Sequence, residues 1–199
     1  MCIAVLNKGP KLAQKTLETM WQSNPQGGGL MYVDKNTKEL VTYKTMFDKK
    51  MFWEYDLAKH RAKDGVVVLH FRIATQGFQE HNLHPFVNNK KNLGFVHNGI
   101  ISQYCSRGHV DSDTLRFHKD VVQGLDASFV YDEELLGRME EFVGAYNKLI
   151  FMNLIGHTAI VNENGGIWVG DDWFSNDGFK TRKHYYGHRL FDNQGLLEF

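Results

Sequence analysis

A nearly unbroken apolar run, VVVLHF at positions 66–71, constrains the fold of this chain more than any other feature. A strand with water on one face alternates apolar and polar residues, whereas a continuous apolar run is typical of a strand buried on both faces. Such a strand needs a cover on each side of its sheet. We therefore expect a layered sandwich of sheets and helices, with residues 66–71 as an inner strand.

The other segments divide into helical and strand-like patterns. Apolar residues at helical spacing predict helices around residues 12–21, 51–58, 114–123 and 135–142. Short apolar runs predict strands at 3–6, 30–33, 40–46, 93–97, 148–155, 157–162 and 166–170, with hairpins across DKNTK and across the Asn-Gly-Gly turn. Because hairpins favour antiparallel sheets, we expect an α+β fold in one domain that covers residues 1–199.

Composition narrows the class of ligand. The chain has 199 residues, of which 42% are apolar, and its 23 basic residues balance its 23 acidic ones. No run of like charges suggests nucleic-acid binding, and no apolar run approaches the roughly 18 residues of a membrane helix. We therefore expect a cytoplasmic protein with a small ligand, without nucleic-acid or membrane partners. The two cysteines, Cys2 and Cys105, are expected to remain thiols.

Polar residues and glycines cluster at the ends of predicted strands, in HFRIATQG (70–77), HNGI (97–100) and DSDT (111–114). Arg72 directly follows the apolar strand, where its guanidinium could bind a ligand carboxylate or form an internal ion pair. Asn98-Gly99 is a strong signal for a tight hairpin turn, and an outward-pointing turn could also supply two donors to an oxyanion. Asp113 could cap a helix, as Ser112 also could, or it could bind an ammonium group.

Two further features do not indicate chemistry by themselves. His184 and His188 are four residues apart, but the YYG between them is poor helix material and no third ligand is evident, so a metal site is not predicted. Cys105 has no base nearby in the sequence, and the simplest interpretation is a packed thiol.

Together the segments resemble one known family, the class II glutamine amidotransferases, which are N-terminal-nucleophile hydrolases. The matching pieces are MC at the start, NPQGGGLMYVD, HFRIATQG, HPF, FVHNGII and SDT, in that order over roughly the first 115 residues. The resemblance implies a four-layered αββα sandwich of two antiparallel sheets between helices. It implies no cofactor.

The resemblance also implies roles for individual residues. Cys2 would be the nucleophile, and Asn98 and Gly99 would form the oxyanion hole. Arg72 would bind the α-carboxylate of glutamine and Asp113 its α-ammonium group. The pocket beside Arg72 would be shaped by Thr75 and Gly77.

The expected reaction begins with removal of Met1, after which the free α-amine of Cys2 can take the thiol proton. The thiolate would attack the side-chain amide of glutamine, and hydrolysis of the γ-glutamyl thioester would give glutamate and ammonia, the latter for a separate synthase subunit. Two alternatives stay open. The chain could be an N-terminal-cysteine amidohydrolase for another amide, or a catalytically silent module that binds glutamine or a protein partner.

Overall fold

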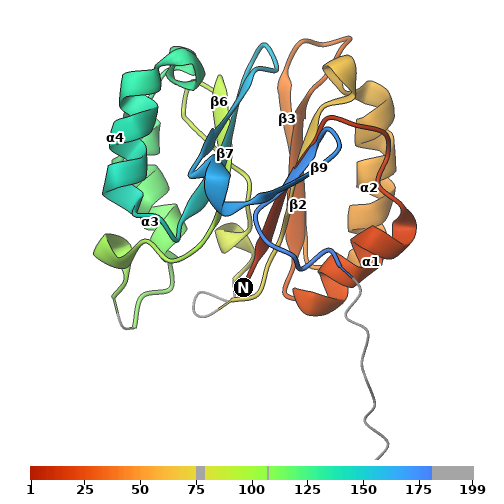
Figure 1. The fold of residues 1–199 in the computed structure, drawn as a ribbon, viewed down its shortest axis with the longest axis horizontal. Coiled ribbons are helices and arrows are strands. Elements are labelled where there is room, and N and C mark those ends of the chain that lie inside the picture. The colour runs from red at the N-terminus through yellow and green to blue at the C-terminus, as the bar shows by residue number, and fades with distance from the viewer. Residues whose placement is uncertain (75–78, 107, 181–199) are drawn as a thin grey trace, which may run out of the picture.

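The computed structural model describes residues 1–74, 79–106 and 108–180. Two antiparallel sheets face each other, with α1 (Gln14–Ser23) and α2 (Asp48–Arg61) outside one of them. The other sheet is covered by α3 (Asp113–Asp120) and α4 (Glu133–Val143) (Figure 1). The predicted α+β class and the four-layered αββα sandwich are confirmed.

The larger sheet has six strands in the order β3-β2-β4-β1-β10-β9. Its members are β1 (Ile3–Asn7), β2 (Gly28–Val33), β3 (Leu40–Thr45), β4 (Val67–Phe71), β9 (Ile167–Val169) and β10 (Asp172–Phe174). The smaller sheet has the order β5-β6-β7-β8, with β5 (Phe86–Val87), β6 (Leu93–Asn98), β7 (Lys148–Asn153) and β8 (Thr158–Val161). Every neighbouring pair of these strands is antiparallel.

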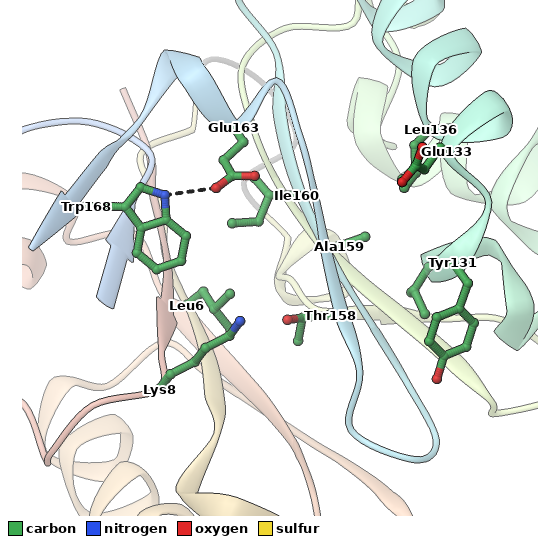
Figure 2. Close-up of a pocket in the computed structure, with 11 residues that line it drawn as sticks. Leu6, Lys8, Tyr131, Glu133, Leu136, Thr158, Ala159, Ile160, Glu163 and Trp168 are labelled. Atoms are coloured by element: carbon green, nitrogen blue, oxygen red, sulfur yellow. Dashed lines mark hydrogen bonds between the residues drawn. The ribbon is translucent and has the colours of Figure 1, made fainter. Parts of the chain in front are cut away.

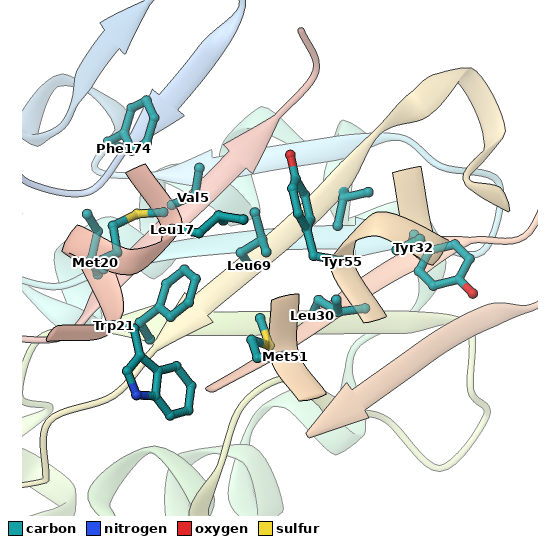
Figure 3. Close-up of a cluster of buried hydrophobic side chains, with 14 of the residues drawn as sticks. Val5, Leu17, Met20, Trp21, Leu30, Tyr32, Met51, Tyr55, Leu69 and Phe174 are labelled. Atoms are coloured by element: carbon teal, nitrogen blue, oxygen red, sulfur yellow. The ribbon is translucent and has the colours of Figure 1, made fainter. Parts of the chain in front are cut away.

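The apolar run 66–71 forms the inner strand that its pattern predicts. All five residues of β4 are buried, and the strand lies between β2 and β1. Alternate side chains of β4 pack on opposite faces of the sheet. Leu69 packs with the helix-facing cluster shown in Figure 3, whereas Val68 packs with residues of the second sheet. Burial on both faces therefore explains the absence of polar alternation in this segment.

The last strands differ from the prediction. We expected residues 157–162 and 166–170 to pair across the Asn-Gly-Gly turn, but β8 belongs to the smaller sheet and β9 pairs with β10 in the larger one. The segment between them is fixed by Trp173, whose Nε1 donates to Glu163 O at 3.0 Å and whose ring lies where a Cβ of Gly166 would be. The predicted hairpin is therefore wrong, because buried packing outweighs the local turn signal.

The helices lie where the spacing predicts, with different ends. The third helix stops at Asp120 rather than at 123, and α2 begins three residues before Met51. Within the described ranges, no helix is long and apolar enough to cross a membrane.

Candidate active site

Cys2 directly precedes β1, a strand with neighbours on both sides. Its thiol is partly buried and donates to Ile73 O at 3.3 Å, while Ile73 N–H points at Sγ from 3.4 Å. Asn176 Nδ2 donates to the carbonyl of Cys2 at 2.7 Å. Burial raises the pKa of the thiol, against the opposing effects of the Ile73 backbone and of the Arg72 charge.

Residues from four separate segments meet at this thiol. Cys2, Arg72, Gly99 and Asp113 line one cavity of about 40 Å³. The other residues of its lining are His70, Ile73, Ala74, His84, His97, Ser112 and Thr114. The fold therefore brings together the three strand-end segments that the sequence singled out.

Arg72 is buried directly behind β4, with 5% of its surface exposed. Its backbone is tied to the glycine-rich loop, because Arg72 N donates to Gly27 O at 2.8 Å and Gln26 N donates to Arg72 O at 3.0 Å. Burial lowers the pKa of the guanidinium, and the nearby Cys2 and Asp113 oppose this shift. A guanidinium nevertheless stays protonated at neutral pH. The cavity therefore holds a fixed positive charge.

Asp113 is the first residue of α3, but it does not cap the helix. Ser112 does so, since its hydroxyl accepts from Leu115 N at 3.1 Å. The Asp113 carboxylate instead accepts from Ile101 N at 2.7 Å. Because Ile101 lies two residues beyond Gly99, this bond ties the carboxylate to the turn at the end of β6.

The turn Asn98-Gly99 ends β6 without forming the tight hairpin that the dipeptide predicts. The strand pairs with β5 and β7, and a short 3-10 turn at Ser102–Tyr104 follows it. Asn98 Nδ2 donates to Ser175 Oγ at 2.8 Å. Gly99 has φ +153°, and a Cβ there would lie 2.9 Å from Asn147 Cα. Gly99 lines the cavity, whereas Asn98 lies just outside the lining.

Ser175 and Asn176 were missed by the sequence analysis. The Ser175 hydroxyl accepts from both Ala4 N, at 2.9 Å, and Asn98, so it joins β1 to the end of β6. These residues belong to SNDG, another polar and glycine-containing cluster directly after a strand. The signal that drew attention to the other three segments would have found this one too.

Three buried histidines form the inner wall of the cavity. His97 Nε2 lies 2.9 Å from Asn147 Oδ1 and Nδ1 lies 2.7 Å from Thr114 Oγ1. Asn147 Oδ1 can only accept, so the network assigns the His97 proton to Nε2. The rings of His70 and His84 lie 4.1 Å apart between centroids.

Burial lowers the pKa of all three histidines, that of His70 to about 3, so they are neutral at pH 7. Among the residues that the structure describes, no group of three or more His, Cys, Asp or Glu side chains is arranged to hold a metal ion.

The remaining sequence expectations have mixed outcomes. Thr75, Gly77, His184 and His188 lie outside the described residues. Cys105 is exposed, so the interpretation as a packed thiol is wrong. It follows a surface 3-10 turn, with Cys105 N bonded to Ser102 O, which leaves the side chain outside the core.

Two of the larger cavities in the described part of the chain lie away from Cys2. One, of about 470 Å³, opens beside β8 and is shown in Figure 2, where Trp168 donates to Glu163 at 2.9 Å. The other, of about 490 Å³, lies beside β3 and β5. None of the predicted site residues within the described ranges lines either cavity.

Comparison with known proteins finds similarity in structure only. No family model matches the sequence, and no curated protein matches it. The similar solved structures include a glutamine phosphoribosylpyrophosphate amidotransferase from B. subtilis, with 16% identity and a TM-score of 0.45 over 87% of this chain. Another is described as the allosteric regulatory enzyme of purine biosynthesis, with 16% identity and a TM-score of 0.47 over 87% of this chain.

A third similar structure is a glutamine aminotransferase class-II domain protein from Silicibacter pomeroyi. It shares 15% identity over 77% of this chain and 73% of its own, with a TM-score of 0.40. The chain spans 41% of the length of the first two structures. These names agree with the family that the motifs resemble, but at such identities and TM-scores the likeness does not extend to activity or substrate.

Proposed function

We propose that this protein hydrolyses the side-chain amide of glutamine, with Cys2 as the nucleophile. The observation that carries the proposal is the single cavity lined by Cys2, Arg72, Gly99 and Asp113. An amino-acid amide substrate requires a nucleophile, opposite charges for its carboxylate and ammonium groups, and a donor for the oxyanion. The thiol, Arg72, Asp113 and the backbone turn at Gly99 could supply them.

The charges of the cavity match those of a free amino acid. Arg72 would hold the α-carboxylate, because a planar guanidinium can donate two parallel hydrogen bonds to it. Asp113 would hold the α-ammonium group while it continues to accept from Ile101 N. Thr75 and Gly77 would shape the pocket beside Arg72. The zwitterion is thus placed with its side-chain amide toward Cys2.

The chemical step requires a base for the thiol, and we infer that removal of Met1 provides it. The exposed α-amine of Cys2 then accepts the thiol proton, since its usual pKa of about 7.7–8.0 leaves much of it neutral near pH 8. Attack of Sγ on the amide carbon places negative charge on the amide oxygen. Gly99 N–H and the second N–H of the Asn98 amide would stabilise that oxygen.

Collapse of the tetrahedral intermediate breaks the carbon–nitrogen bond, and the leaving nitrogen takes the proton from the amine as ammonia. Water then hydrolyses the γ-glutamyl thioester, which releases glutamate and restores the thiol. A separate synthase subunit as the acceptor of the ammonia, and a cytoplasmic location, stay predictions.

A catalytically silent module that binds glutamine or a protein partner stays open as the second candidate. A cavity of about 40 Å³ has room for only a few water molecules, at roughly 10–15 Å³ each, so binding or turnover of glutamine requires that the lining opens. An N-terminal-cysteine amidohydrolase for another amide stays open as well, although the pair of opposite charges favours an amino-acid substrate.

The proposal is tested by intact-mass spectrometry before and after incubation with a glutamine-like diazo-ketone. We expect a mass without Met1 and a single adduct that maps to Cys2, together with release of ammonia from glutamine. Cys2→Ala should lose both adduct and activity, whereas Cys105→Ala, which changes the exposed thiol, should keep both. Retained Met1 without adduct or turnover would overturn the proposal, and glutamine binding in that state would identify the silent module.

A further inference from the structure

The cavity of about 490 Å³ beside β3 and β5 is lined by an excess of basic side chains. It lies where the edge strands of the two sheets meet α3. Lys44 comes from β3, and His118 and Lys119 come from α3. His81 completes the basic groups, and among the described lining residues Asp111 is the one carboxylate.

Lys44 is the unusual member of this lining. It lies two residues from Thr42 on the face of β3 that is turned toward the other sheet, the face on which Leu40 joins the core between the sheets. Its ammonium group lies 4.5 Å from the centre of the Phe86 ring. Burial lowers its pKa to about 8, and no described carboxylate opposes this shift. Lys44 is thus partly withdrawn from water without an anionic partner in the described part of the chain.

The negative charge of Asp111 is already engaged. Its carboxylate accepts from Lys119 Nζ at 2.6 Å and lies 3.1 Å from His81 Nε2. The lining therefore carries two lysines against one aspartate, and Asp111 is paired with Lys119 rather than with Lys44.

His118 supplies a second group that lacks a partner. Gln123 Oε1 accepts from Asn89 N at 2.7 Å, so its Nε2 is the atom that donates to His118 Nε2 at 2.8 Å. The ring proton of neutral His118 is then on Nδ1. This nitrogen is buried and has no hydrogen-bond partner among the described residues, in a side chain that is 6% exposed. A buried donor without an acceptor is costly, but this nitrogen is closed off from the cavity as well as from water, so His118 lines the cavity without offering this donor to a ligand.

We propose that this cavity binds a small oxyanion, a phosphate or carboxylate group, through the Lys44 ammonium with support from Lys119. Residues that are neighbours in the sequence line the two cavities. Pro85 and Asp111 line this cavity, whereas His84 and Ser112 line the cavity at Cys2. The ligand would therefore lie behind two segments that form the wall of the catalytic cavity. Nothing in this argument depends on glutamine as the substrate of Cys2.

Isothermal titration calorimetry at constant ionic strength tests the proposal, with inorganic phosphate and acetate as separate probes. We expect saturable binding of at least one probe to the wild-type protein. Lys44→Met, which removes the charge and keeps most of the length of the side chain, should weaken binding by about 10- to 100-fold, the usual effect of losing a charge-assisted contact. Lys44→Arg should retain most of it.

Lys50→Met is the matched control, because Lys50 also lies over a phenylalanine ring, at 5.1 Å from the centre of Phe47, but is exposed. It should bind as the wild type does. Binding of phosphate alone would identify a phosphate group as the ligand. Binding of acetate alone would identify a carboxylate group. Binding of both probes would show that the cavity accepts either oxyanion. Absence of saturable binding by the wild type, or equal affinity in Lys44→Met, would overturn the proposal and leave Lys44 as a packing residue over Phe86. Because Lys44 and Cys2 line different cavities, failure here leaves the glutaminase test unaffected.

Discussion

Ser112 caps α3, and this leaves the carboxylate of its neighbour Asp113 turned to the cavity rather than to the helix. The sequence offered both residues for the cap and could not choose between them, because the choice depends on Ile101 N, a donor twelve positions earlier in the chain. The motif thus identified the right residues for the lining. Their orientation required the fold.

We predict that Asp113→Asn raises the KM for glutamine by roughly 10- to 100-fold, because it removes the charge opposite the ammonium group. The amide oxygen can still accept from Ile101 N, so the turn and the kcat should change little. Steady-state glutaminase kinetics with a parallel thermal melt would measure both effects. Asp120→Asn, at the exposed end of the same helix, is the control. An unchanged KM would contradict the role given to Asp113.

Elements whose pattern reflects burial were predictable, and those fixed by a distant partner were not. The strand at 66–71 and the four helices follow from apolar spacing alone. The chain passes from the smaller sheet to the larger one between β8 and β9. This passage depends on Trp173, which occupies the space beside Gly166. The same limit applies to Ser175, since no local pattern tells that its hydroxyl meets Asn98.

Two glycine substitutions test this difference between structure set by the local sequence and structure fixed by a residue far along the chain. Gly137 is an exposed interior residue of α4 with no atom near an added Cβ, so Gly137→Ala should stabilise the protein by about 0.5–1 kcal/mol. Gly166→Ala should destabilise it by about 1–3 kcal/mol, because the added methyl meets the buried Trp173 ring. Urea unfolding of both variants provides the values. Equal effects of the two substitutions on the free energy of unfolding would show that Trp173 does not fix the segment between β8 and β9.

At the scale of the whole molecule, neutral histidines make stability depend on pH. Burial lowers the pKa values of His70, His84, His97 and His118, to about 3 for His70 and to about 4 for His118, against about 6.5 in the unfolded chain. The unfolded state therefore binds more protons below pH 6.5. Stability is fully present above that pH and is lost as the pH falls from about 6.5 toward 4.

We predict that the free energy of unfolding falls between pH 6.5 and pH 4.5 with a slope of up to about 1.4 kcal/mol per pH unit for each such histidine. Urea unfolding at several pH values would measure the slope. His118→Gln should make it shallower, whereas His60→Gln, at an exposed position, should leave it unchanged. An identical slope in the wild type and in His118→Gln would refute the assignment of a buried neutral His118.

The place of β1 between β4 and β10 sets an order of events during synthesis. Residues 3–7 are made long before residues 172–174, so β1 gains its second neighbour only late in synthesis. At about 5–20 residues per second, roughly 9–34 s separate these events. The segment around Cys2 therefore adjoins a complete six-stranded sheet only after residues 172–174 have been made. Removal of Met1, which the proposed function requires, can therefore take place before the cavity at Cys2 has formed.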